Sequence, residues 1–177
     1  LEEPGLGVEI GVGTARFAAP LGIPVGLDPS MAMLRHARER GISVVCGVAE
    51  ALPFRDAVFD SLLIVTTICF VDDAEAMLVE ARRVLAPAGR LVIGFIDRTS
   101  RLGRYYEAHR SENVFYRDAT FFSADEVQDL LERTGYGPPR WRQTLTQPLA
   151  DMTGPEPTRS GTGEGAFVVV AASARPA

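Results

Sequence analysis

One acid and two glycines near the start of the chain form the stretch best suited to bind a ligand. In "EIGVGTA", residues 9–15, Glu9 lies in an apolar run, and Gly11 and Gly13 follow it. Glycine lets the backbone turn sharply and lets a ligand approach with no Cβ in the way. The amides of a following helix also favour negative charge. The stretch therefore predicts a ligand-binding turn between a strand and a helix.

The same turn disfavours a dinucleotide cofactor. A nicotinamide or flavin fingerprint would carry a third glycine at position 16, where this chain has Arg16. The pattern excludes the tight approach to a pyrophosphate that three glycines allow. A dehydrogenase is therefore the least favoured function.

Two further acids follow apolar runs, Asp28 after "IPVGL" and Glu50 after "SVVCGVA". An ionised Asp28 can accept both hydroxyl groups of a ribose, as acids do in dinucleotide sites. Taken singly, each feature has a plain structural interpretation: a turn, a helix lead-in at Asp28-Pro29 and a solvated surface acid. Their joint order, at the ends of three successive predicted strands, favours a shared binding site.

Apolar runs of strand length alternate with helical patterns along the chain. We predict strands at residues 5–12, 23–28, 43–48, 59–71, 90–97, 140–147 and 165–174. A short helix is expected around residues 15–20, and longer helices after Ser30, after Asp72 and after Ser123. The pairs Asp72 with Glu75 and Ser123 with Glu126 fit capping boxes.

This alternation predicts a doubly wound, mostly parallel α/β sheet with helices on both faces. The last two strands are expected to form an antiparallel pair, joined by a loop rich in Gly, Pro, Ser and Thr. In such sheets ligands bind at the carboxyl ends of the strands, where the winding direction reverses. The glycine turn and the two acids all fall at such ends.

Size and composition indicate one globular domain spanning residues 1–177. The chain is 46% hydrophobic and 23% charged, with a net charge of -5 that argues against sequence-independent binding to nucleic acid. The lead-in "LEEPG" is short, so we expect the domain to lack an N-terminal helical segment. No signal peptide or long apolar span stands out, which predicts a cytoplasmic protein with no membrane partner.

The cysteine pattern gives no metal site. Cys46 and Cys69 both lie in apolar runs, so we expect buried thiols in a reducing compartment. No spacing of Cys and His suits a zinc ion.

Read as Glu9-x-Gly11-x-Gly13, the glycine turn resembles the first motif of class I S-adenosylmethionine-dependent methyltransferases. "LDPS" (27–30), "GVAEALPF" (47–54) and "RVLAPAGRL" (83–91) resemble that family's ribose acid, adenine loop and helix-to-strand signature. The resemblance runs from Glu9 to Ala172 and is to small-molecule enzymes like those of ubiquinone and menaquinone biosynthesis. It implies a Rossmann-like seven-stranded sheet with an antiparallel final strand, and S-adenosyl-L-methionine as cofactor.

The resemblance also implies roles for individual residues. Glu9 would lie near the methionine end of the cofactor, and Asp28 would bind the ribose hydroxyls. The other implied contacts are Gly11, Val12, Gly13 and Thr14 along the methionine and ribose, Pro29, Ser30 and Met31 against the adenine, Ala49 and Glu50 at its edge, and Val65 and Thr66 facing the transferred methyl. Val48 stands where the family often has an acid, so adenine recognition would use backbone groups around Ala49 or the side chain of Glu50.

No catalytic residue is predicted, because methyl transfer from a sulfonium needs mainly alignment and exclusion of water. The chain also lacks the Asn-Pro-Pro-Tyr type of motif found in many enzymes that methylate nucleic acid or protein amino groups, which favours a small-molecule acceptor. Tyr105, Tyr106 and His109 lie in an aromatic segment, residues 98–122, that we interpret as a substrate lid in which His109 could act as a general base. The alternative, favoured for His109, is a surface helix whose aromatics pack on the core and whose histidine is solvated.

Two functions from different classes remain open. The first is a methyltransferase that acts on a small molecule by in-line displacement. The second is a non-catalytic S-adenosylmethionine-binding domain with a regulatory or partner-binding role.

Overall fold

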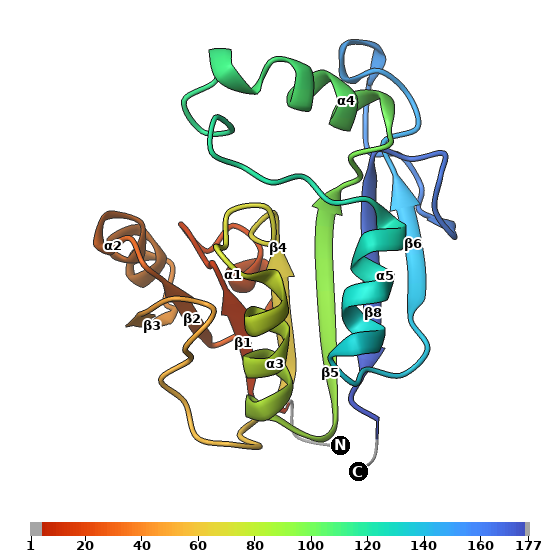
Figure 1. The fold of residues 1–177 in the computed structure, drawn as a ribbon. Coiled ribbons are helices and arrows are strands. Elements are labelled where there is room, and N and C mark those ends of the chain that lie inside the picture. Colours follow the sequence, from red (N-terminus) through yellow and green to blue (C-terminus); the bar gives the residue numbers. More distant parts are fainter. Residues whose placement is uncertain (1–4, 176–177) are drawn as a thin grey trace.

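Within the described part of the chain, eight strands form one sheet in the order β3-β2-β1-β4-β5-β8-β6-β7 (Figure 1). The computed structural model describes residues 5–175, so the expectation about the N-terminal lead-in concerns residues that lie mostly outside this range. The strands are β1 (Gly7–Ile10), β2 (Val25–Asp28), β3 (Ser43–Cys46), β4 (Phe59–Val65), β5 (Leu85–Ile96), β6 (Arg140–Thr144), β7 (Arg159–Ser160) and β8 (Phe167–Ser173).

The pairing confirms a doubly wound, mostly parallel sheet with an antiparallel end. Strands β3, β2, β1, β4 and β5 pair with their neighbours in parallel. β8 then runs antiparallel to both β5 and β6, although it is the last strand in sequence. The final pair of strands is therefore antiparallel, as predicted.

The predicted number of seven strands is wrong, because β7 adds an eighth. This two-residue strand pairs with β6 inside the segment interpreted as a loop. The buried side chain of Gln143 on β6 organises that segment: its amide nitrogen donates to the Ser160 carbonyl oxygen at 3.3 Å, and its amide oxygen accepts from Glu164 and Gly165. The pairing of β6 with β7 is short and is held by one side-chain amide that is distant in sequence. It therefore leaves no periodic pattern of apolar residues in the sequence.

Residues 5–175 form five α-helices: α1 (Ala18–Leu21), α2 (Met31–Glu39), α3 (Ala74–Val84), α4 (Arg101–Ala108) and α5 (Ala124–Arg133). Of these, α4 lies beyond the carboxyl end of β5 and not over a face of the sheet (Figure 1). Side chains alternate between the faces of β1, and Val8 and Ile10 join the core that contains residues of α3 and α5. Glu9, between them, reaches α1 instead. Helices therefore lie on both faces, and Figure 1 shows α3 and α5 together over one of them.

The helix starts were predicted with mixed success. Ser30 caps α2 and Ser123 forms a capping box with Glu126, both as expected. The cap of α3 was placed one residue too early, since the carboxylate of Asp73, and not that of Asp72, accepts from the first-turn amides. Glu75 lies three residues after Asp72 while Ala76 lies three after Asp73, so the capping-box spacing favours the wrong one of two adjacent aspartates. α1 is also shorter than the predicted helix at residues 15–20 and starts later.

The predicted strand at residues 59–71 is too long. β4 ends at Val65 because Thr66 has a positive φ of 52°, which turns the chain away from the sheet. The Thr66 amide still donates to the Gly94 carbonyl oxygen of β5 at 2.8 Å. Beyond the turn, Ile68 returns to the main core, whereas Cys69 forms a small separate cluster with Ala119 and Phe121.

The two cysteines differ in burial. Cys69 is buried as predicted, but the expectation for Cys46 is wrong, because it is exposed. Cys46 ends β3, which is an edge strand and so has a neighbour on one side only. Across residues 5–175, no helix has the length and apolar character needed to span a bilayer.

Candidate cofactor-binding site

A cavity of about 500 Å³ opens at the carboxyl ends of β1, β2 and β4. Its walls include eight residues of the predicted cofactor set: Gly11, Gly13, Asp28, Pro29, Ala49, Glu50, Val65 and Thr66. These residues come from four separate segments that the parallel strands bring to one edge. The sheet therefore assembles the predicted ligand-binding edge.

The glycine turn presents bare backbone to this cavity. The amides of Gly11 and Val12 both donate to the Leu27 carbonyl oxygen, at 2.7 and 2.9 Å, which fastens the turn to the end of β2. Gly13 has a φ of 51°, and a Cβ built on it would meet no protein atom within 4 Å. Because Gly13 lines the cavity, this open space is available to a ligand.

Asp28 is held in one orientation beside the turn. Its Oδ2 accepts from the Gly13 amide at 2.9 Å, and its Oδ1 accepts from the Ser30 amide at 2.8 Å. Each carboxylate oxygen keeps a free lone-pair direction after these bonds. The side chain can therefore accept two hydroxyl groups from a sugar in the cavity.

Glu9 lies behind the turn and not in the cavity wall. Its side chain is only 1% exposed, and Oε2 accepts from the Ala18 amide at the start of α1 at 2.8 Å. Burial raises the pKa of Glu9 to about 7, partly opposed by that hydrogen bond. The buried acid thus positions α1 against β1, beneath the backbone that faces the ligand.

Replacing Glu9 with glutamine should change how stability depends on pH. The unfolded chain releases the Glu9 proton near the ordinary pKa of 4.5 and the folded chain near 7, so wild-type stability falls as the pH rises through this window. Glutamine keeps the acceptor for the Ala18 amide and has no proton to lose.

We expect the free energy of unfolding of Glu9→Gln, relative to wild type, to rise by about 2 kcal/mol between pH 5 and pH 8. Urea unfolding at the two pH values measures it. The same substitution at the exposed Glu132, Glu132→Gln, serves as control. Its free energy of unfolding relative to wild type should change by less than about 0.5 kcal/mol between the two pH values. A Glu9 variant that follows the control would show that Glu9 ionises as freely as a surface acid.

Several predicted cofactor residues lie outside the cavity wall. Val12 is buried against Gly26, the Thr14 carbonyl oxygen accepts from Arg40, and Ser30 caps α2. Met31 is 53% exposed, and Met33 lines the cavity in its place. Both methionines fall in the first turn of α2, so the choice between them depends on how the helix is docked.

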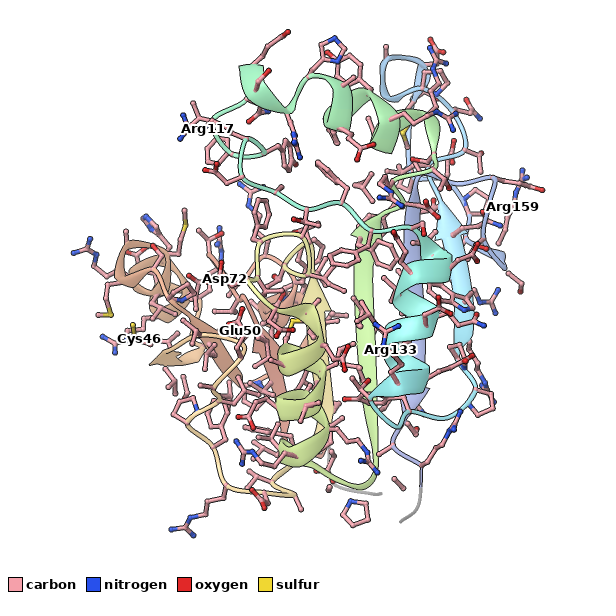
Figure 2. The ribbon with its side chains drawn as sticks, viewed as in Figure 1. Cys46, Glu50, Asp72, Arg117, Arg133 and Arg159 are labelled. Atoms are coloured by element: carbon pink, nitrogen blue, oxygen red, sulfur yellow. The ribbon has the colours of Figure 1, made fainter. Side chains whose placement is uncertain are left out.

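Sequence reasoning missed the segment after β4 as a wall of the cavity. Phe70, Val71 and Asp72 line it, and Glu50 fastens this segment in place. Glu50 Oε1 accepts from the Asp72 amide at 2.8 Å and from the Asp73 amide at 3.4 Å. Figure 2 labels Glu50 and Asp72 near each other beside α3. This hydrogen bond is evident only from the fold, because 22 residues separate Glu50 from Asp72 in the sequence.

The charges of the cavity select among ligands. The described residues that line it include three carboxylates, those of Asp28, Glu50 and Asp72, and no arginine or histidine. Like charges repel at short range, so a pyrophosphate is disfavoured and a ligand that carries positive charge is favoured. An adenosyl sulfonium, with its sugar beside Asp28, fits these hydrogen-bond acceptors and charges.

The predicted substrate residues lie apart from this cavity, beyond the carboxyl end of β5 (Figure 1). Tyr105, Tyr106 and His109 line an outer cavity of about 200 Å³, together with Tyr116. Between the two lies an inner cavity of about 20 Å³, whose walls include Thr66 and Tyr116.

Comparisons with known proteins agree with this geometry. The model of a methyltransferase domain family matches residues 8–93. A crystal structure from Thermotoga maritima, described as a SAM-dependent methyltransferase and possible histamine N-methyltransferase, is 48% identical, with a TM-score of 0.95 over 99% of this chain and 84% of that one.

Two relatives of undescribed function are also similar. An uncharacterised protein of Methanocaldococcus jannaschii is 42% identical over 95% of this chain and 82% of its own length. One from Mycobacterium tuberculosis is 44% identical over 80% of this chain, which spans 50% of that relative. The chain belongs to the S-adenosylmethionine-dependent methyltransferases, with S-adenosylmethionine as its cofactor.

Proposed function

We propose that the enzyme methylates a small-molecule acceptor, which binds between the end of β4 and the aromatic segment at residues 98–122. In this proposal Asp28 accepts the ribose hydroxyls, the Gly11–Gly13 backbone lies along the methionine, and Val65 and Thr66 face the methyl group. When bound, the cofactor supplies an electrophilic methyl group. The residues of the chain align the acceptor in line with it and keep water away.

The position of Thr66 carries this proposal. Thr66 lines both the cofactor cavity and the inner cavity. The inner cavity, at about 20 Å³, has room for only about one water molecule, so the aromatic side chains around it must move apart for an acceptor to reach the cofactor past Thr66. Tyr116 in turn lines both the inner cavity and the outer cavity. The three cavities therefore adjoin one another in a row, from the cofactor cavity to the surface of α4.

Aromatic rings form the walls along this row. The rings of Tyr106 and Tyr116 are stacked with centroids 4.9 Å apart, and Phe121 and Phe70 lie 5.7 and 6.1 Å from Tyr116. Stacked aromatic side chains offer flat apolar surface to a ligand. They support an acceptor with an apolar or planar reacting end and argue against a nucleic-acid backbone.

No strong base borders the inner cavity among the residues described. Burial raises the pKa of the Cys69 thiol to about 11, and burial also raises the pKa of Tyr116, so neither is ionised near neutral pH. The acceptor must then present a lone pair without help from these groups. Catalysis by alignment alone is consistent with the absence of a predicted catalytic residue.

His109 is placed for contact with the outer part of an acceptor. Its Nδ1 lies 2.9 Å from the Tyr105 carbonyl oxygen and so acts as a donor, and its ring stacks on Tyr105 at 4.4 Å. It lines the outer cavity and not the inner one. We therefore assign it to binding and not to proton removal at the reacting atom.

A label-transfer experiment tests the acceptor class. The enzyme is incubated with methyl-labelled S-adenosylmethionine and a cell extract separated into small-molecule, protein and nucleic-acid fractions. We expect label to move into the small-molecule fraction only. Transfer confined to protein or nucleic acid would refute a small-molecule acceptor.

Tyr106→Ala should slow methyl transfer without weakening cofactor binding. Loss of the ring opens the aromatic wall and loosens alignment, so we expect the rate of label transfer to fall by about tenfold or more. The affinity for S-adenosylhomocysteine, measured by calorimetry, should stay within about twofold.

Phe115→Ala is the matched control, because Phe115 belongs to the same segment but is 77% exposed and lines none of the three cavities. It should leave both quantities unchanged. If Tyr106→Ala reduces cofactor affinity as much as the rate, the tyrosine supports the fold and not the acceptor.

A further inference from the structure

Asp72 is a carboxylate in the cofactor cavity with no described partner. Of the three lining acids, Asp28 accepts two backbone amides and Glu50 accepts the amides of Asp72 and Asp73. Asp73, the next residue, caps α3 through its own side chain. Within residues 5–175, no hydrogen bond or ion pair reaches the Asp72 carboxylate, so both of its oxygens are available to a ligand.

The hydrogen bond to Glu50 fixes the backbone position of Asp72. Because Glu50 holds the backbone amide of Asp72 at 2.8 Å, the residue lies next to the loop that contains Val48 and Ala49. That loop follows β3, two strands away from β1 in the sheet. Asp72 thus joins the wall at the β3 side of the cavity, away from the glycine turn.

The cavity also has apolar walls that suit a flat base. Val48 follows β3, Met33 lies in the first turn of α2 and Val71 directly precedes Asp72, and all three line the cavity. With the ribose at Asp28 and the methionine along Gly11–Gly13, the purine ring falls among these apolar side chains. The one edge group of adenine that can only donate is its exocyclic amino group, and it needs an acceptor when water is displaced.

We propose that Asp72 accepts a hydrogen bond from the 6-amino group of the cofactor's adenine, and so makes the site selective for a 6-aminopurine. The proposal rests on the cofactor and on the placement of its ribose at Asp28, not on the identity of the methyl acceptor. Glu50 then has a positioning role, because the Glu50 carboxylate holds the backbone of Asp72, whose side chain contacts the adenine.

Calorimetry with two ligands tests this contact. The probes are S-adenosylhomocysteine and its 6-deamino analogue, in which hydrogen replaces the amino group. Wild type should prefer S-adenosylhomocysteine by about tenfold or more, as expected for a hydrogen bond to a charged group. In Asp72→Ala the preference should fall to within about twofold, mainly through weaker binding of S-adenosylhomocysteine. The backbone amide held by Glu50 remains in this variant.

Asp73→Asn is the matched control, since it removes the same charge one residue away and asparagine still caps a helix. It should keep the wild-type preference. An Asp72→Ala variant that retains the preference, or that loses affinity equally for both ligands, would overturn the contact. So would a wild type that binds both ligands equally. Failure of wild type to bind either ligand would overturn the cofactor placement and this proposal with it.

Discussion

Asp28→Ala is expected to weaken binding of S-adenosylhomocysteine by about 1–3 kcal/mol, or roughly 5- to 150-fold. The substitution removes the acceptor for two sugar hydroxyls. It also removes the partner of the Gly13 and Ser30 amides, which loosens the glycine turn that faces the ligand. Isothermal titration calorimetry gives the dissociation constant, and thermal unfolding reports whether the fold is intact.

Asp60→Ala provides a matched control for Asp28. The Asp60 carboxylate also accepts a backbone amide, that of Leu6 at 2.7 Å, but it lies at the opposite end of β4 from the cavity. Its loss should leave the affinity unchanged. An unaltered dissociation constant for Asp28→Ala would remove this residue from the binding site.

Gly11→Ala is expected to destabilise the fold by about 3 kcal/mol or more. A Cβ at position 11 would stand 2.2 Å from Oγ1 and 2.3 Å from Cγ2 of Thr67, and the φ of +70° disfavours any side chain. Overpacking of this kind and the backbone strain each contribute, the strain by about 1–2 kcal/mol. Urea unfolding measures the loss.

Two further variants separate the contact from the strain. Gly13→Ala carries a similar φ of +51° but meets open space, so it should cost only about 1–2 kcal/mol. Combining Gly11→Ala with Thr67→Ala removes the two closest atoms, and the double variant should be more stable than the sum of the single losses predicts. Equal losses for Gly11→Ala and Gly13→Ala would show that Thr67 does not press on the turn.

Local patterns predicted the first three strands of the sheet well. β1, β2 and β3 all lie within the apolar runs that indicated them, and Ser30 and Ser123 cap helices where their spacing places them. The predicted helix caps are correct because a cap is a local feature. The serine side chain binds a backbone amide only a few residues away, in the helix that it starts. The resemblance to the methyltransferases also gave the correct cofactor.

The features that sequence did not reveal depend on contacts between distant segments. β4 stops where Thr66 adopts a left-handed conformation, which threonine rarely favours and which no local pattern marks. Cys46 is exposed because its strand lies at the sheet edge, a fact of strand order and not of its apolar neighbours. Phe70 and Asp72 line the cavity because the chain turns after β4, and the sequence pattern gave no sign of that turn.

The place of β8 has a consequence for biosynthesis. β6 and β7 reach the sheet only through β8, because β6 pairs with β8 and not with β5. Until residues 167–173 have been translated, β1, β2, β3 and β4 have all their neighbours, but β5 and β6 both lack β8, the strand that lies between them. The strands that line the cofactor cavity can therefore pair before the antiparallel side of the sheet is complete. That side is completed only when almost the whole described length has been translated. Such late, long-range pairing is slow and leaves an open strand edge for chaperones to shield.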